Sequence, residues 1–207
     1  MSDQPTLLVV ASHNQNKIRE IKELVRDLNF KVVSIGELGD FPEVEEDGTT
    51  FKENARKKAL ETAQHVNQWV LADDSGLEVD ILDGAPGVYS ARFAGEPGND
   101  RKNNQKLLEL LQGVGPEQRG AQFRCVMALA SPSGRVDYTE GICRGQIGLF
   151  PQGENGFGYD PLFIVPEYGK TFAQLDSELK NKISHRGRAA EQMKKILQAY
   201  EKSLNSC

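Results

Sequence analysis

Several features that would point to particular protein classes are scarce in this sequence. Only three of the 207 residues are cysteines, and no pair of them has the Cys-x-x-Cys spacing of a zinc or redox site. We therefore expect neither a disulfide framework nor a zinc centre, and a reducing, cytoplasmic location is the simplest expectation. Cys125 and Cys143 lie in strand-like runs, where we expect them to be small core residues.

Long apolar runs are missing as well. The longest fall far short of the roughly 20 residues that span a bilayer. The first residues, Met-Ser-Asp-Gln-Pro-Thr, lack the charged and apolar regions of a signal peptide. We therefore expect no membrane association. The net charge of −5 argues against broad attraction to nucleic acid or anionic lipid, although it leaves room for a local basic pocket.

Nothing in the composition divides the chain. A length of 207 residues would permit one large domain or two small ones. No Gly/Ser-rich linker, internal repeat or low-complexity stretch separates two parts, so we expect a single domain over residues 1–207. The apolar fraction of 38% and the charged fraction of 27% are typical of a globular protein.

The order of strand and helix patterns predicts an α/β protein with a mixed sheet. Strands and helices alternate early in the chain, and a long hairpin follows them. The predicted strands cover residues 7–10, 31–35, 69–72, 123–130, 136–147 and 161–165. Four helices are predicted. The first has helical spacing over residues 18–28, and the second opens at the capping-box pattern Thr50 to Glu53 and ends near Val66. The third is capped by Asn99 or Asp100, and the fourth follows Arg186.

A polar stretch, "SHNQNK", links the first strand to the first helix. A helix N-terminus offers unpaired N–H groups and partial positive charge, which together suit phosphate. Asn14 can donate through its amide, and Lys17 adds a full charge. The alternative is that Asn14 or Asn16 caps the helix while Lys17 is solvated. The stretch lacks the GxxxxGK[ST] pattern, so it is not a Walker P-loop.

Two adjacent aspartates, Asp73 and Asp74, are expected to leave a buried strand and to enter Ser75-Gly76. Adjacent carboxylates repel each other, and proteins usually accept that cost for a metal ion or for catalysis. The alternative is a turn or a helix cap, which Asp and Ser also favour. The acidic run Glu45-Glu46-Asp47 is typical of a solvated face, and it would gain a function only if the fold brought it near Asp74.

Two later stretches could contact a flat ligand. In "NGFGYDP", glycines around Phe157 allow close approach of the backbone, and the ring could stack on a base. In "SHRG", His185 and Arg186 lead a helix and could donate to a carbonyl or a phosphate. The alternatives are a Gly-rich hairpin turn and a capped helix start.

Taken together, these stretches resemble the inosine triphosphate pyrophosphatase family, whose members hydrolyse deaminated purine nucleoside triphosphates. The resemblance covers the chain from Leu7 to the C-terminal helix. Its motifs occur in family order: "SHNQNK", "TFKENARKKA", "LADDSGLEVDILDGAPGVYSARFAG", "ENGFGYDPLF" and "KNKISHRGRA". Ser12-His13 departs from the Thr-Gly or Ser-Asn that the family often has there. The Ser hydroxyl is kept. His13 stands at a position of the substrate-binding stretch, but the resemblance does not say what its imidazole does there.

The resemblance implies an elongated, two-lobed α/β fold, with a long twisted mixed sheet flanked by helices and a nucleotide cleft between the lobes. It implies a homodimer and an Mg²⁺-dependent reaction that converts a nucleoside triphosphate into the monophosphate and pyrophosphate. It makes Glu46 and Asp74 the metal and water-activating carboxylates. Asp74 is the expected general base, with Asp73 as a rival. The implied substrate-binding positions are Ser12, His13, Asn14, Gln15, Asn16, Lys17, Lys58, Ser75, Phe157, Gly158, Tyr159, Asp160, Lys180, His185 and Arg186.

Under this interpretation, Arg186 and His185 would donate to the 6-oxo group of the base, and adenine would leave those donors unpaired. Three alternatives use the same residues differently. A nucleotide sensor would bind without turnover, although both Glu46 and Asp74 are present. A Maf-type pyrophosphatase would need motifs that this sequence lacks. A binder of single-stranded nucleic acid could stack bases on Phe157, but the acidic balance argues against it.

Overall fold

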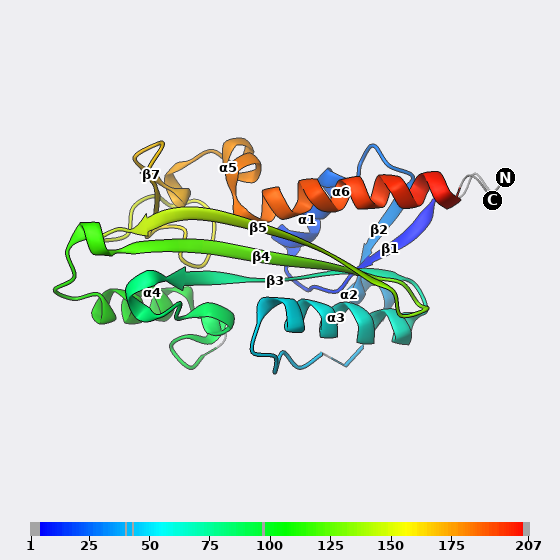
Figure 1. Ribbon diagram of the computed structural model, residues 1–207, viewed down its shortest axis with the longest axis horizontal. Helices are drawn as coiled ribbons and strands as arrows, with labels where there is room; N and C mark the ends of the chain where they lie inside the picture. Colours follow the sequence, from blue (N-terminus) through cyan, green and yellow to red (C-terminus); the bar gives the residue numbers. More distant parts are fainter. Residues whose placement is uncertain (1–4, 40, 43, 97, 205–207) are drawn as a thin grey trace. The chain divides into compact units, whose positions relative to one another are not determined.

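The computed structural model describes residues 5–39, 41–42, 44–96 and 98–204, and it has an α/β fold built on a seven-stranded mixed sheet (Figure 1). The strands lie in the order β2-β1-β3-β4-β5-β6-β7. β1 pairs in parallel with both β2 and β3, whereas β6 is antiparallel to β5 and β7. The strand bounds are β1 Thr6–Val10, β2 Phe30–Ser34, β3 Trp69–Val79, β4 Gly120–Ala130, β5 Val136–Ile147, β6 Phe163–Val165 and β7 Lys170–Thr171. The α/β class and the mixed sheet are therefore confirmed.

Helices connect the first four strands in chain order, and two more α-helices follow the last strand. The α-helices are α1 Gln15–Leu24, α2 Ile35–Leu38, α3 Phe51–Val66, α4 Asp100–Leu110, α5 Ser177–Ile183 and α6 His185–Leu204. Short 3₁₀ helices are η1 Asp80–Leu82, η2 Gly87–Arg92, η3 Pro116–Gln118 and η4 Phe172–Gln174. No helix in the described part of the chain is long and apolar enough to cross a bilayer.

The chain forms two compact units, each drawn from several segments. The first comprises Met1–Asp74, Val126–Glu140 and Arg188–Cys207, and the second comprises Ser75–Cys125 and Gly141–Gly187. Strands β3, β4 and β5 contribute residues to both. The single domain over residues 1–207 and the two-lobed shape with a nucleotide cleft stay predictions.

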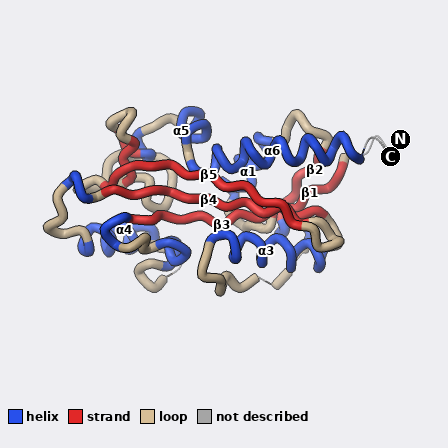
Figure 2. The backbone as a smooth tube through the Cα atoms, in the orientation of Figure 1, coloured by secondary structure: helices blue, strands red, loops and turns tan. Residues whose placement is uncertain are grey.

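Helices cover both faces of the sheet in the first unit. Figure 2 shows α3 on one face and α6 on the other, and α6 is tied to β5 where the Thr139 hydroxyl donates to the Ala189 carbonyl at 2.9 Å. This sandwich buries apolar side chains of β1 and β3 completely. Its buried members include Leu8, Val9, Val10, Ile21, Ala55, Ala59, Val70, Leu71, Ala189, Met193 and Leu197. A core on both faces of a parallel strand explains the unbroken apolar run of β1.

The second unit has a core of its own. Leu107 and Leu111, on α4 and just after it, pack into a cluster with Leu77, Phe123 and Phe163. Cys143 belongs to this cluster, and Cys125 is also buried, so the prediction that both are core residues is confirmed. Cys207 lies outside the described residues.

Most predicted elements are confirmed, with shifted ends. Thr50 caps α3 by accepting from the Glu53 amide, and Asn99 caps α4 by accepting from the Lys102 amide. The first helix covers residues 15–24 rather than 18–28, because the chain turns after Leu24 to enter β2.

The prediction that a strand ends at Ala72 is wrong. β3 continues through Asp73, Asp74, Ser75 and Gly76 to Val79. Its pairing with β1 stops at Leu71, but β3 also lies beside β4, which is itself eleven residues long. Both aspartates therefore lie inside a strand, and the turn or cap alternative is wrong as well.

Candidate active site

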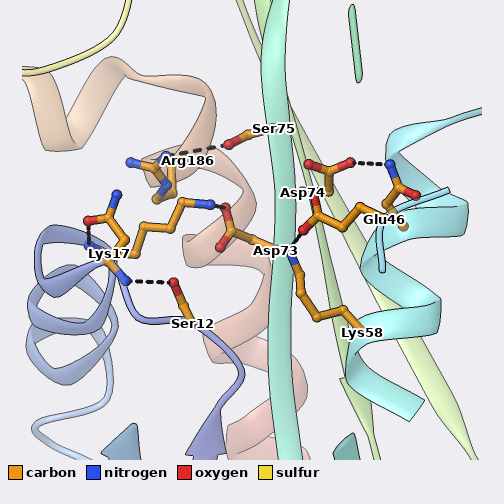
Figure 3. Close-up of polar contacts among 10 residues, drawn as sticks. Ser12, Lys17, Glu46, Lys58, Asp73, Asp74, Ser75 and Arg186 are labelled. Carbon is orange, nitrogen blue, oxygen red and sulfur yellow. Dashed lines mark hydrogen bonds and ion pairs between the residues drawn. The ribbon is translucent and has the colours of Figure 1, made fainter. Parts of the chain in front are cut away.

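The two aspartates of β3 point to opposite faces of the sheet, as successive residues of a strand must. The Lys17 ammonium, on α1, lies 2.7 Å from the Asp73 carboxylate. The Asn54 amide, on α3, donates to Asp74 Oδ2 at 2.9 Å. Figure 3 shows both contacts, with Asp73 directed toward α1 and Asp74 directed toward α3. The two carboxylates thus have different partners and different surroundings.

The stretch before α1 is organised by its own side chains. The backbone N–H of Asn14 donates to the Ser12 hydroxyl at 3.1 Å. The side-chain oxygen Oδ1 of Asn14 accepts from the backbone N–H of Lys17 at 3.3 Å. Asn14 therefore caps α1, as one part of the alternative for this stretch predicted. The alternative of a solvated Lys17 is wrong, because its ammonium pairs with a buried carboxylate.

Three other residues of this stretch have less defined surroundings. His13 and Gln15 are exposed, and the His13 ring lies close to Gly36, where an added Cβ would be 3.4 Å from Nδ1. The side chain of Asn16 lies outside the described part. Phosphate binding by the stretch stays a prediction.

The acidic run before α3 is held against that helix. Lys58 forms an ion pair with Glu46, and Lys57 forms one with Asp47 at 2.7 Å. Glu45 is exposed, and Glu43 lies outside the described residues. Glu46 is partly buried and its charge raises the pKa of Asp74, so the fold meets the condition under which the acidic run would gain a function.

Burial and neighbouring charges together set the pKa of the Asp74 carboxyl. Burial raises its pKa most, the Glu46 charge raises it further, and Lys58, Asn54 and Lys17 oppose these effects, which leaves a pKa of about 6. Burial lowers the pKa of Lys58, but the charges of Asp73 and Glu46 outweigh it, so the net change is upward. The result is a carboxylate that can accept a proton near neutral pH, next to a lysine that stays protonated.

Glu46 and Asp74 are also the carboxylate pair that could hold a cation. Within the described ranges, no group of three or more His, Cys, Asp or Glu side chains could enclose a metal ion. Mg²⁺ needs no such cage, because it keeps several waters and binds one or two carboxylates plus substrate phosphates. The donor set therefore fits Mg²⁺ better than it fits zinc.

A second group of predicted residues lies in the second unit. Arg186 Nη2 donates to the Ser75 hydroxyl at 3.4 Å, a contact that Figure 3 marks. The Arg186 guanidinium and the Lys180 ammonium lie 5.4 Å and 5.2 Å from the centre of the Phe157 ring. Both distances are within the range of a cation–π contact. The fold thus gathers Phe157, Lys180 and Arg186.

Asp160 fixes the loop that carries Phe157. Its Oδ2 accepts from the Phe157 amide at 2.9 Å and lies 2.5 Å from the Lys180 ammonium. Burial raises the pKa of Asp160, and the Lys180 charge opposes that rise. Two further residues, which the sequence patterns do not identify, hold the backbone of Gly158, the next residue of the loop. Asp100 accepts from the Gly158 amide at 2.6 Å, and the Asn104 amide donates to the Gly158 carbonyl at 2.8 Å.

Two predicted substrate contacts have packed side chains. Tyr159 is a member of the hydrophobic cluster, and its hydroxyl donates to the Ser90 carbonyl at 2.9 Å. The His185 ring stacks on Phe123, with 4.7 Å between centres and 12° between planes. Ser184 accepts from the Gly187 amide at 3.1 Å, so the capped helix start is present as well. The substrate contacts of Tyr159 and His185 stay predictions.

Comparisons with known proteins identify the family of the chain. The model of the Ham1 family matches residues 8–196. The chain is 58% identical over 190 residues to the dITP/XTP pyrophosphatase of Desulforamulus reducens. The aligned region covers 92% of this chain and 94% of that protein. The Bacillus subtilis protein of the same name is 48% identical over 191 residues, with 92% and 96% covered.

Solved structures give the same result. A HAM1 protein from Coxiella burnetii superposes with a TM-score of 0.88 at 43% identity, covering 94% of this chain and 99% of that one. The Staphylococcus aureus Ham1 protein has a TM-score of 0.86 at 44% identity, covering 94% and 100%. These matches confirm the family resemblance drawn from the motifs, and the chain belongs to the Ham1 family.

Proposed function

We propose that this protein hydrolyses deaminated purine nucleoside triphosphates, namely ITP, dITP and XTP, to the monophosphate and pyrophosphate, and so clears them before they enter DNA and RNA. The observation that carries the proposal is the arrangement of charged side chains around β3: Asp74 is buried and hydrogen-bonded to Asn54, and two lysines are held by carboxylates, Lys58 by Glu46 and Lys17 by Asp73. The names of the relatives from D. reducens and B. subtilis, dITP/XTP pyrophosphatase, support the same activity.

In this proposal, Asp74 takes a proton from the attacking water. The water oxygen forms a bond to the α-phosphorus, the bond from that phosphorus to the bridging oxygen breaks, and pyrophosphate leaves. Charge builds on the phosphoryl oxygens during attack, so positioned cations supply much of the rate. Lys17 and Lys58 are the proposed cations, and each is held in place by a carboxylate before the substrate arrives.

Mg²⁺ is the proposed cofactor, and Glu46 and Asp74 are its proposed protein ligands. When bound, it would neutralise charge on the phosphates and orient water. The ion pair of Glu46 with Lys58 fits this role, because the lysine can balance the carboxylate charge when no cation is present. The lysine would then be available to the phosphates once the cation binds.

Base choice is assigned to the second group of residues. Phe157 would stack on the purine, while Arg186 and His185 would donate to the 6-oxo group, with Ser75, Lys180 and Asp160 supporting them. Adenine carries an amino donor at position 6 and would leave the buried donors without an acceptor. Guanine shares the 6-oxo group, so its exclusion depends on the 2-amino group.

A homodimer, a cytoplasmic location and the absence of nucleic-acid binding complete the proposal. Light scattering behind a sizing column would test the dimer. Gel-shift assays with single-stranded DNA and RNA at physiological salt would test the last point, since electrostatic binding depends on salt.

A nucleotide panel tests the activity. ITP, dITP, XTP, GTP and ATP are incubated with the protein and Mg²⁺, and pyrophosphate is assayed separately from orthophosphate. The proposal predicts pyrophosphate from the first three nucleotides, little from GTP and ATP, and none after chelation of the metal. Tight binding of ITP without any product would indicate a nucleotide sensor instead.

A further inference from the structure

Asn54 makes two hydrogen bonds that join the site from two sides. It lies in the first turn of α3 and is 1% exposed. Its Nδ2 donates to Asp74 Oδ2 at 2.9 Å, and its Oδ1 accepts from the Gly48 amide at 2.8 Å. One buried side chain therefore connects a carboxylate of β3 with the backbone that follows the acidic run.

The backbone that Asn54 holds leads directly to Glu46. Gly48 comes two residues after Glu46, and the next amide, that of Thr49, donates to Glu53 at 2.8 Å. An added Cβ on Gly48 would lie only 2.6 Å from Asn54 Oδ1, so the close approach depends on the glycine. The segment with Glu46 is thus anchored to α3 at the helix N-terminus as well as through Lys58.

The chemistry of an amide suits this place. A primary amide donates and accepts at once, so it can hold a carboxylate on one side and a peptide N–H on the other. It brings no positive charge, so it orients Asp74 without neutralising it. A lysine in the same position would hold the carboxylate equally well, but it would compete with a cation for the negative charge.

We infer that Asn54 is a positioning residue, which orients the Asp74 carboxylate and fixes the Glu46 segment so that the two carboxylates can share one divalent cation. The inference rests on the proposed function, and it adds a residue that acts through Asp74 and Glu46 without touching the nucleotide. Outer partners of metal ligands typically change metal affinity or activity by about 10–100-fold when they are removed.

The experiment compares three variants of the full-length protein. Asn54→Ala removes both hydrogen bonds. Gly48→Ala keeps the asparagine at position 54 but adds a Cβ that would lie 2.6 Å from Asn54 Oδ1, so it disturbs the hydrogen bond on the loop side. Asn103→Ala is the matched control, because Asn103 is also 1% exposed and also accepts from one backbone group and donates to another, those of Ala94 and Ala91. Unfolding midpoints measure the loss of stability in each.

Two readouts are taken for each variant. The first is kcat and KM for pyrophosphate release from ITP, per folded molecule. The second is Mn²⁺ binding to the nucleotide-free protein, measured by calorimetry. For Asn54→Ala we expect kcat to fall about 10–100-fold with KM within about threefold of wild type, and Mn²⁺ affinity to fall about tenfold. Gly48→Ala should lower kcat and Mn²⁺ affinity by smaller factors than Asn54→Ala does. Asn103→Ala should change neither kcat nor Mn²⁺ affinity.

The inference is overturned if Asn54→Ala matches Asn103→Ala in both readouts, since Asn54 would then be a structural residue only. A rise in KM without a fall in kcat would also overturn it, because that result would place Asn54 at the nucleotide. If the wild-type protein releases no pyrophosphate, the proposed function fails, and the Mn²⁺ titration alone decides the inference. Weaker Mn²⁺ binding in Asn54→Ala then supports it, and equal binding contradicts it.

Discussion

The Lys17 ammonium lies 2.7 Å from the Asp73 carboxylate, and the Asp73 side chain is only 2% exposed. The pair is on the face of β3 opposite to Asp74, which contacts Asn54 of α3. Sequence left open which of the two adjacent aspartates is the general base. The ion pair indicates that Asp73 serves to hold Lys17, and it leaves Asp74 as the better candidate.

The first prediction separates the two aspartates by turnover. Asp74→Asn should lower kcat for ITP by about 10²–10⁴-fold, because an amide cannot take a proton from water. Asp73→Asn should mainly raise KM, since Lys17 loses the partner that positions it. Steady-state kinetics on both variants checks this. A larger loss of kcat in Asp73→Asn than in Asp74→Asn would transfer the role of base to Asp73.

The second prediction concerns stability and pH in metal-free buffer. The folded-state pKa of Asp74 is about 6, above its ordinary value of 3.8. Below about pH 3 the carboxyl is protonated in both the folded and the unfolded state, so it does not change the stability. As pH rises toward 6 the unfolded chain ionises first, so the folded state loses about 3 kcal/mol of stability, and the loss persists above pH 6.

Asp74→Asn should therefore be more stable than wild type by up to about 3 kcal/mol at pH 7–8, and the difference should vanish below about pH 3. Urea unfolding in EDTA at several pH values measures the difference. A gain that does not depend on pH would contradict the assignment of the raised pKa to Asp74.

The third prediction concerns the polar stretch before α1. If Lys17 holds phosphate, Lys17→Ala should lower kcat/KM for ITP and for GTP by the same factor, roughly 10–100-fold for a lost charge-assisted hydrogen bond. Lys22→Ala is the control, because Lys22 lies on the same helix and pairs at 3.6 Å with Glu37, both half exposed. A change confined to the ITP-to-GTP ratio would show that Lys17 does not serve the phosphates.

Much of the fold could be predicted from local patterns. The capping box at Thr50 and Glu53 predicted the start of α3, and the apolar run before "SHNQNK" predicted β1. β3 could not be predicted beyond Ala72, because Asp, Ser and Gly are poor strand formers and read as a turn. Its extension depends on the neighbouring strand β4, some 50 residues later, which a local pattern does not contain.

The candidate site was predicted through its motifs, and its supporting residues were not. Asn54 falls inside the helix that the sequence predicts after Thr50, and in the structure it shares the buried face of α3 with Phe51 and Ala55. A polar residue on the apolar face of a helix is a signal that could have identified it. Asp100 and Asn104 gave no comparable signal, because their partner is the backbone of Gly158, which no side-chain pattern records.

The fourth prediction concerns base selectivity. Phe157→Ala should lower kcat/KM for ITP and for ATP by the same factor. The lost base stacking corresponds to about 1–3 kcal/mol of binding free energy. Arg186→Ala should reduce the preference for ITP over ATP, because a donor to the 6-oxo group is lost. Both variants are assayed on both nucleotides side by side. Equal losses on ITP and ATP in Arg186→Ala would make Arg186 a phosphate-binding or structural residue.

The most direct test of the central claim is the position of attack on ITP. The protein hydrolyses ITP in ¹⁸O-labelled water with Mg²⁺, and mass spectrometry locates the label in the products. Attack at the α-phosphorus with water activated by Asp74 predicts one ¹⁸O in IMP and none in the released pyrophosphate. Label in pyrophosphate, or release of orthophosphate as the first product, would contradict the account.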